Sequence, residues 1–281
     1  MKQIFSLLIL WILQCILSCN NIDSTKLSKE QQNDTSKTNS NKPLSEKDFT
    51  INAEDILKDF KTWYDYTYYN IHLAQDFIGL DTDSSKINKT EFLTRLTTGN
   101  FVPLKILIRN NVPIYRLYKL NNNVDIRATI KQAALHEISN YKMEGKELPN
   151  FNLTDLNGNI YNKTTTHKKI IVLKCWFIRC VACVKEFPEL NKLVDEYKQN
   201  SDVLFISLAM DSKQDLIPFL SKRQFKYAVV PEKKKYMEED LGINAYPTHI
   251  LIDKNGKIVK VVNNVDDLIP FLKQQTKNTV L

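Results

Sequence analysis

The sequence predicts an α/β fold in its C-terminal half, preceded by a smaller α+β domain. Two continuous apolar runs, at 170–173 and 203–209, are typical of strands that a sheet buries on both faces. Helical patterns at 186–197 and 213–224 follow these two runs. Because strands that alternate with helices pack as layers, we expect a central mixed sheet flanked by helices.

Hairpin signals complete the C-terminal half. Apolar and polar residues alternate at 151–161, around an Asn-Gly pair at 157–158 that favours a two-residue turn. A second Asn-Gly pair, at 255–256, predicts another hairpin after a short strand at 228–230. An amphipathic segment at 266–273 predicts the last helix.

The N-terminal half predicts three helices and two strands. A helical pattern at 56–77 carries an aromatic stripe, and apolar residues at 92–96 indicate a second helix. The remaining elements are expected as strands at 101–108 and 112–120 and as a helix at 126–143. Because aromatic stripes at helical spacing usually belong to a core, no residue of this half predicts a ligand site or a role.

The two halves are predicted to meet in a charged stretch at 142–149, which contains a Gly and a Pro. We therefore expect an N-terminal α+β domain over 48–143 and a C-terminal domain over 146–275. Both lengths lie within the usual range for a domain.

The start of the chain predicts export and a lipid anchor. A short positive region precedes an apolar run at 4–17, which is too short for a transmembrane helix and has the proportions of a signal peptide. The segment Ile-Leu-Ser-Cys at 16–19 resembles a bacterial lipobox, which implies removal of residues 1–18 and lipidation of Cys19. The alternative is an ordinary cleaved signal peptide with an incidental cysteine.

A polar segment at 19–47, rich in Asn, Ser, Thr and Lys, predicts a disordered tether. The formal net charge of +7 predicts weak attraction to anionic lipid or acidic partners. The sequence contains no basic cluster with interleaved aromatic residues, so it does not indicate nucleic acid as a partner. We expect a cell-envelope protein that faces the periplasm and is lipid-anchored to a membrane, with the choice between inner and outer membrane left open.

Cys180 and Cys183 form a Cys-x-x-Cys pair between a predicted buried strand and a helix. Backbone N–H groups and the helix dipole face Cys180 and favour its thiolate, whereas Cys183 lies one turn later and is more shielded. The pair therefore predicts an attacking and a resolving sulfur. Zinc would need two further ligands, and a static disulfide across so short a loop would stabilise the fold little. When the two cysteines are considered without the other motifs, a coincidental Cys-x-x-Cys spacing also stays open as an alternative.

Further motifs around this pair are shared with one family. The matching residues are Trp176, Cys180, Cys183, Glu186, Pro188 and the run Tyr246-Pro247-Thr248. With these motifs, the segment 146–275 resembles the TlpA/ResA-like thiol-disulfide oxidoreductases of the thioredoxin superfamily. The resemblance implies a thioredoxin-like fold with an extra N-terminal β-hairpin.

The resemblance also implies an enzyme that reduces disulfides of envelope proteins, in which thiolate Cys180 attacks and Cys183 resolves the intermediate. Glu186 falls where ResA-like proteins place an active-site glutamate, and we expect burial to raise its pKa so that it accepts the proton of Cys183. The implied substrate-binding residues are Trp176, Tyr246 and Pro247. A membrane electron donor of the DsbD type is implied as the upstream partner, with neither a cofactor nor a metal.

The chain departs from the family pattern at several positions. Lys174 occupies the position of a buried thioredoxin aspartate, so that route for the proton is missing. Arg179 replaces a Trp and would lower the pKa of Cys180 unless it points into water. Cys175 is interpreted as a buried free thiol. We interpret His249 as a strand residue and not as a copper ligand.

Two other function classes remain as alternatives. A peroxiredoxin-like peroxidase would need a Thr three residues before the reactive cysteine, where Phe177 stands. A non-enzymatic copper-handling or adaptor module would act through the N-terminal domain beside a vestigial redox site. Retention of both cysteines together with Trp176 and Pro247 argues against this second class.

Overall fold

The computed structural model of the chain describes residues 52–277, and it places residues 46–281 in one compact unit. The predicted signal peptide, Cys19 and the tether at 19–47 lie outside the described residues. Within the described range, every helix is too short or too polar to span a membrane.

The first sheet has four strands in the order β2-β1-β4-β3. Strand β1 runs parallel to β4, and the other neighbours pair antiparallel. The strands predicted at 101–108 and 112–120 are confirmed, whereas β1 and β2 are too short to show a readable alternation. Their bounds are Ile78–Leu80 for β1, Lys86–Ile87 for β2, Phe101–Arg109 for β3 and Val112–Lys119 for β4.

The single helix predicted at 56–77 is wrong, because two helices stand there. Asp59 is extended, and its carboxylate accepts the Thr62 backbone N–H at 2.7 Å, which starts a new helix. Ile71 is extended again and ends that helix. The other two predicted helices are confirmed. The bounds are Ala53–Leu57 for α2, Phe60–Asn70 for α3, Lys89–Thr97 for α4 and Val124–Met143 for α5.

The aromatic stripe of α3 is only partly core. Trp63 is buried with Phe92 and Tyr115, as the helical spacing predicts. Tyr68 and Tyr69 are instead exposed at 65% and 73% of their surface. Phe60 and Tyr64 are exposed as well, so the expectation that the stripe belongs to the core holds for Trp63 and is wrong for these four rings.

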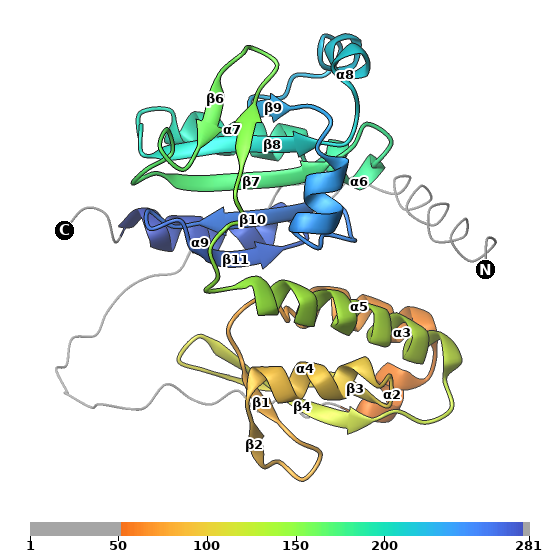
Figure 1. The fold of residues 1–281 in the computed structure, drawn as a ribbon. Coiled ribbons are helices and arrows are strands. Elements are labelled where there is room, and N and C mark those ends of the chain that lie inside the picture. The colour runs from red at the N-terminus through yellow and green to blue at the C-terminus, as the bar shows by residue number, and fades with distance from the viewer. Residues whose placement is uncertain (1–51, 278–281) are drawn as a thin grey trace, which may run out of the picture. The chain divides into compact units, whose positions relative to one another are not determined.

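The second sheet has five strands in the order β11-β10-β7-β8-β9. Strands β7, β8 and β9 run parallel, and β10 pairs antiparallel with both β7 and β11. This mixed sheet confirms the predicted fold class (Figure 1). The bounds are Ile170–Trp176 for β7, Val203–Ala209 for β8, Ala228–Val230 for β9, Thr248–Ile252 for β10 and Ile258–Val262 for β11.

Helices of this half follow the predicted order with shifted ends. The helix predicted at 213–224 ends at Leu220, and the backbone N–H of Ser221 donates to the carbonyl of Ile217 in its last turn. A π-helical turn, η2, was not predicted. The bounds are Val181–Lys185 for α6, Phe187–Tyr197 for α7, Lys213–Leu220 for α8, Tyr236–Asp240 for η2 and Val265–Lys277 for α9.

The hairpin predicted at 151–161 is present as β5, Asn152–Thr154, and β6, Ile160–Asn162. Its turn is longer than the two residues expected. The Asp155 carboxylate accepts the backbone N–H groups of Asn157 and Asn159, and this Asx-type arrangement widens the loop.

Successive side chains of β7 point to opposite faces of the second sheet, and this alternation decides which layer each polar side chain enters. Ile170 and Val172 pack with α7 and α9, whereas Ile171, Leu173 and Cys175 pack on the other face with the hairpin and η2. Lys174 shares the face of Ile170 and Val172. The sheet therefore directs a lysine into the layer between β7 and the helices.

Candidate active site

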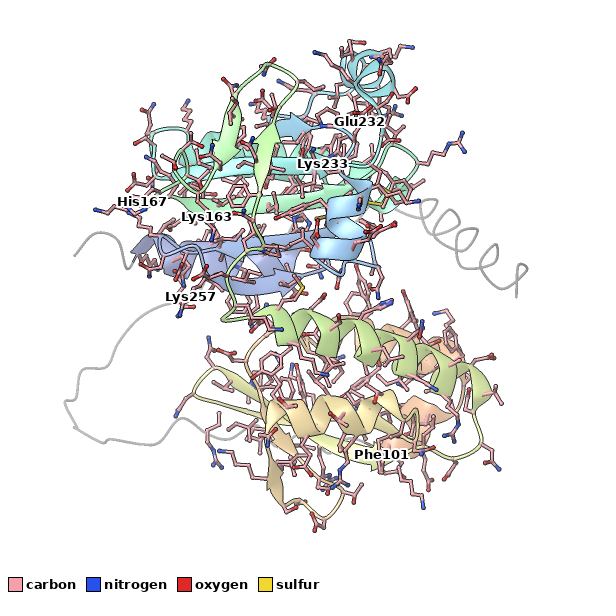
Figure 2. The ribbon with its side chains drawn as sticks, viewed as in Figure 1. Phe101, Lys163, His167, Glu232, Lys233 and Lys257 are labelled. Atoms are coloured by element: carbon pink, nitrogen blue, oxygen red, sulfur yellow. A yellow bond between two sulfur atoms is a disulfide. The ribbon has the colours of Figure 1, made fainter. Side chains whose placement is uncertain are left out.

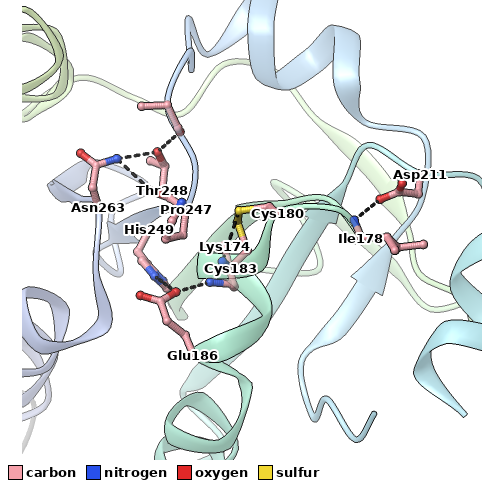
Figure 3. The surroundings of a disulfide bond; sticks show 11 residues. Lys174, Ile178, Cys180, Cys183, Glu186, Asp211, Pro247, Thr248, His249 and Asn263 are labelled. Atoms are coloured by element: carbon pink, nitrogen blue, oxygen red, sulfur yellow. Dashed lines mark hydrogen bonds and ion pairs between the residues drawn. A yellow bond between two sulfur atoms is a disulfide. The ribbon is translucent and has the colours of Figure 1, made fainter. Parts of the chain in front are cut away.

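The two predicted cysteines form a disulfide at the start of α6 (Figure 3). Their sulfurs are 2.02 Å apart and their Cα atoms 5.2 Å apart. Cys180 is the N-cap residue of α6, and its Sγ accepts the backbone N–H of Cys183 at 3.2 Å. Cys180 is 8% exposed and Cys183 is fully buried, so the expected difference in shielding is present.

The loop before Cys180 is held by hydrogen bonds from both sides. The backbone N–H of Cys180 donates to the carbonyl of Phe177 at 3.0 Å. The N–H of Ile178 donates to the Asp211 carboxylate at 2.7 Å, which ties the loop to the end of β8. These bonds hold the disulfide at the carboxyl end of the central strand.

Trp176 does not lie at the surface of the site. Its side chain is fully buried and contacts the rings of Phe187, Phe219 and Phe225. A residue with no accessible surface has no contact with an incoming polypeptide, so the prediction that Trp176 binds substrate is wrong. Trp176 packs in one hydrophobic cluster with Cys180 and Cys183, and it thereby supports the start of the active-site helix.

The Tyr246–Pro247 peptide bond is cis. The Asn263 side-chain amide donates to the carbonyl of Pro247 and to the hydroxyl of Thr248, both at 2.9 Å. Tyr246 is partly exposed, and its ring meets Phe177 edge to face at 5.6 Å. Pro247 lies close to the disulfide in Figure 3, and substrate docking by this loop stays a prediction.

A buried charge cluster lies behind the disulfide. Glu186 comes from the junction of α6 and α7, and its Oε2 is 2.5 Å from Lys174 Nζ and 3.0 Å from His249 Nε2. Its other oxygen, Oε1, accepts the backbone N–H of Val265 at 3.0 Å. Lys174 and His249 are fully buried side by side on β7 and β10. We call these three side chains the Lys-Glu-His cluster.

The cluster reverses the pKa shift expected for Glu186. Burial alone would raise the pKa of this carboxyl, but the hydrogen bonds and charges of His249 and Lys174 outweigh burial and hold the pKa below its usual value. Burial lowers the pKa of Lys174, with Glu186 opposing that shift. Burial and the Lys174 charge lower the pKa of His249. The expectation of a raised Glu186 pKa is therefore wrong.

His249 is the site residue that sequence reasoning missed. The sequence signal available was a histidine two residues after the cis-proline, on a strand that the sheet buries. Only the β7–β10 register, which pairs His249 with Lys174, shows that the two polar residues share one face. Arg179 is exposed, whereas Cys175 is a buried free thiol, as predicted. Burial raises the pKa of Cys175 to about 12.

Metal ligation has no geometric support in the described part of the chain. Among residues 52–277, no group of three or more His, Cys, Asp or Glu side chains is arranged to hold an ion. In the Lys-Glu-His cluster, the Lys174 ammonium forms an ion pair with the Glu186 carboxylate, the group that a metal ion would need as a ligand.

Comparisons with known proteins point to one family. The AhpC/TSA family matches residues 145–261. The thiol-disulfide oxidoreductase ResA of Bacillus thuringiensis strain Al Hakam is 34% identical over 136 residues, which are 47% of this chain and 78% of the relative. ResA of Bacillus cereus strain ATCC 10987 is 33% identical over 140 residues, with 48% and 80% covered.

Solved structures with similar folds were also found. The thioredoxin domain of a thiol-disulfide oxidoreductase from Bacteroides vulgatus has a TM-score of 0.43 and 25% identity, covering 47% of this chain and 96% of that domain. A thiol:disulfide interchange protein DsbE from Chlorobium tepidum has a TM-score of 0.42 and 24% identity, covering 48% and 96%.

The ResA relative of Bacillus thuringiensis matches over 78% of its own length. Residues 145–261, which the AhpC/TSA family matches, contain the Cys180–Cys183 disulfide and the cis Tyr246–Pro247 bond. The chain therefore belongs to the TlpA/ResA-like thiol-disulfide oxidoreductases of the thioredoxin superfamily.

Proposed function

We propose that this enzyme is a lipid-anchored reductase of protein disulfides in the bacterial cell envelope. The observation that carries the proposal is the Cys180–Cys183 disulfide, with its more exposed sulfur beside the cis Tyr246–Pro247 bond. A dithiol poised at a helix start and next to a docking loop is suited to exchange with a disulfide in another chain.

In the reduced enzyme, the thiolate of Cys180 attacks one sulfur of the substrate disulfide. That S–S bond breaks, a bond from Cys180 to the substrate forms, and the departing substrate thiolate takes up a proton. Cys183 then loses its proton and attacks Cys180, which closes the Cys180–Cys183 bond and releases the second substrate thiolate. The substrate gains two electrons and the enzyme dithiol loses two.

Each part of the site has a distinct task in this sequence. The backbone N–H of Cys183, which donates to Cys180 Sγ in the disulfide form, also favours negative charge on that sulfur when it is reduced. In this proposal a substrate strand docks beside Pro247 by hydrogen bonds to the backbone of Tyr246. Reduction of the enzyme for the next cycle is assigned to a DsbD-type membrane donor.

The test is an insulin-disulfide reduction assay with the full-length protein, together with Cys180→Ser and Cys183→Ser variants. We expect Cys180→Ser to abolish turnover and Cys183→Ser to accumulate a mixed disulfide through Cys180. Cys175→Ala is the matched control and should keep wild-type turnover. Peroxide consumption without insulin reduction would favour the peroxidase alternative, and a lack of both activities would favour a binding module.

The anchor is tested separately by membrane fractionation of cells that express the full-length chain. Lipidation at Cys19 would place wild-type protein with the membranes, and Cys19→Ala would block processing or release the protein. Wild-type protein found wholly in the soluble envelope fraction would remove the anchor from the proposal and leave the reductase activity untouched.

A further inference from the structure

A pocket of about 360 Å³ lies where the N-terminal helices meet the cis-proline loop. Tyr246 and Pro247 belong to its lining, together with residues of α3, α5 and the first turn of α9. Its volume is in the range of sites that enclose a ligand group. A polypeptide that docks beside Pro247 would therefore have this pocket within reach of one of its side chains.

The charged groups of the lining are acidic. Among the described residues that line the pocket are the carboxylates of Glu137 and Asp267, with neither a lysine nor an arginine. Two histidines, His72 and His136, also line it, and His72 Nδ1 lies 3.9 Å from Asp267 Oδ1. The oxygens of Asp267 already accept two side-chain amides, at 3.1 and 2.7 Å. Glu137 is therefore the acid that is available to a ligand. We call this site the acidic pocket.

Two oxygens of the lining residues lack hydrogen bonds. Glu137 Oε1 and Thr67 Oγ1 are buried and have no partner among the described residues, although both side chains belong to the pocket lining. Such atoms are uncommon in native structures, and a bound group that supplies the missing donor is one explanation. A carboxylate oxygen only accepts hydrogen bonds, and a hydroxyl accepts them as well. The pocket therefore suits a ligand with several donors.

The cations near Glu137 have partners of their own. The Lys89 ammonium donates to two backbone carbonyls just before β1, at 3.1 and 3.2 Å, and Lys260 forms an ion pair with Glu144 at 3.1 Å. Burial raises the pKa of Glu137 to about 7, although the charges of Lys89 and Lys260 oppose this shift. A cation that enters the pocket would favour the ionised carboxylate, so ligand and acid would stabilise each other.

We propose that the acidic pocket is a subsite for a lysine or arginine side chain of the substrate polypeptide, with Glu137 as the counter-ion; this inference rests on the proposed reductase function. The apolar lining residues, which include Ile71, Leu73 and Ile130, cover the methylene stem of that side chain. Its charged end donates to Glu137 and Thr67.

This subsite gives the N-terminal half a role in the choice of substrate. A basic residue near the substrate cysteine favours docking, whereas an acidic residue at the same place is repelled by Glu137. The formal net charge of the chain is +7, which by itself would disfavour basic substrates. A measured preference for a basic residue would therefore have a local cause.

A second pocket of about 360 Å³ provides a matched control. It lies at the end of β7 opposite to the disulfide, and several lysines line it, among them Lys163, which is labelled in Figure 2. Glu147 in this lining is exposed and pairs with Lys163 at 3.3 Å. Glu147→Gln therefore removes the same charge as Glu137→Gln, but from a carboxylate outside the acidic pocket.

The test uses the reduced full-length protein and disulfide-linked homodimers of a short peptide with a single cysteine. Lysine, norleucine or glutamate is placed in turn at each of the three positions on either side of that cysteine, and single-turnover rates are measured by acid quench and chromatography. At the position that reaches the pocket, wild type should reduce the lysine peptide about 10-fold faster than the norleucine peptide and the glutamate peptide most slowly. This lysine-to-norleucine ratio should fall to about one in Glu137→Gln and stay at the wild-type value in Glu147→Gln.

Equal wild-type rates for lysine and norleucine at every position would overturn the inference, and so would a lysine preference that survives in folded Glu137→Gln. If Glu137→Gln does not fold, Ala133→Lys decides, because Ala133 is an exposed residue of the pocket lining. The added ammonium should abolish the preference for lysine, and an unchanged preference would contradict the subsite. The failure of the reductase proposal looks different, because wild type would then reduce none of the peptides and the inference would fall with it.

Discussion

At the scale of single residues, the hydrogen-bond partners of Glu186 affect its pKa more strongly than its burial does. Its side chain is 13% exposed, and both oxygens accept hydrogen bonds, one from Lys174 and His249 and the other from a backbone N–H. Each donor stabilises the ionised form. Lys174, which is fully buried, depends in turn on Glu186 as its counter-ion.

Glu186→Gln is expected to destabilise the fold by about 3–5 kcal/mol at neutral pH, because it leaves the buried Lys174 ammonium without a counter-ion. Its partners hold the folded pKa of Glu186 below its usual value, so the ionised form contributes stability at neutral pH. This contribution is lost as pH falls through the folded pKa. Urea unfolding at a series of pH values should therefore show the gap between wild type and Glu186→Gln shrinking in acid.

Glu189→Gln is the matched control, since Glu189 is half-exposed on α7 and pairs with Lys192 at the surface. We expect it to change stability by less than about 1 kcal/mol. Adding Lys174→Met to Glu186→Gln should recover much of the loss, because the unpaired charge is removed as well. A double variant no more stable than Glu186→Gln would argue against the ion pair as the cause.

The three described cysteines should differ sharply in reactivity once the disulfide is reduced. Cys180 is the most exposed of them, whereas Cys175 is fully buried with its pKa raised to about 12. Alkylation of the reduced protein with iodoacetamide, followed by peptide mass spectrometry, should label Cys180 first and Cys175 last. Labelling of Cys175 ahead of Cys180 would contradict the assignment of the attacking sulfur.

At the scale of elements, local signals in the sequence predicted most strands of the second sheet and the position of the dithiol. The run at 203–209 is a strand at those residues, because a sheet that covers both faces selects an unbroken apolar stretch. The helix break at Asp59 and the pairing of Lys174 with His249 were not predicted. The break depends on a cap and the pairing on strand register, so neither follows from periodicity.

The turn between β10 and β11 gives a prediction at this scale. Gly256 has φ of +80° with open space where a Cβ atom would sit, so an added side chain meets backbone strain and not a clash. Gly256→Ala should lower the free energy of unfolding by about 1 kcal/mol. Gly256→Asn should cost less, since Asn tolerates this conformation. Equal losses in chemical denaturation would show that the backbone conformation is not the cause.

At the scale of the whole molecule, hydrogen bonds join the N-terminal helices to the catalytic half of the compact unit. The buried Asn140 of α5 donates its side-chain amide to Asn263 Oδ1 at 2.8 Å. Asn263 in turn holds the carbonyl of Pro247. The division into domains at 48–143 and 146–275 stays a prediction. The contact between Asn140 and Asn263 could not be predicted from local patterns, because it joins residues far apart in the chain.

Asn140→Ala is expected to destabilise the protein by about 1–3 kcal/mol, because it leaves the side-chain oxygen Oδ1 of Asn263 without its hydrogen-bond donor. The loosened Asn263 should hold the cis-proline loop less firmly, so we expect a higher KM for insulin with little change in kcat. Gln132→Ala, at an exposed position of the same helix, is the control and should alter neither quantity. If Asn140→Ala lowers stability but leaves KM at the wild-type value, the N-terminal helices stabilise the unit without positioning the docking loop, and Asn263 orders Pro247 by itself.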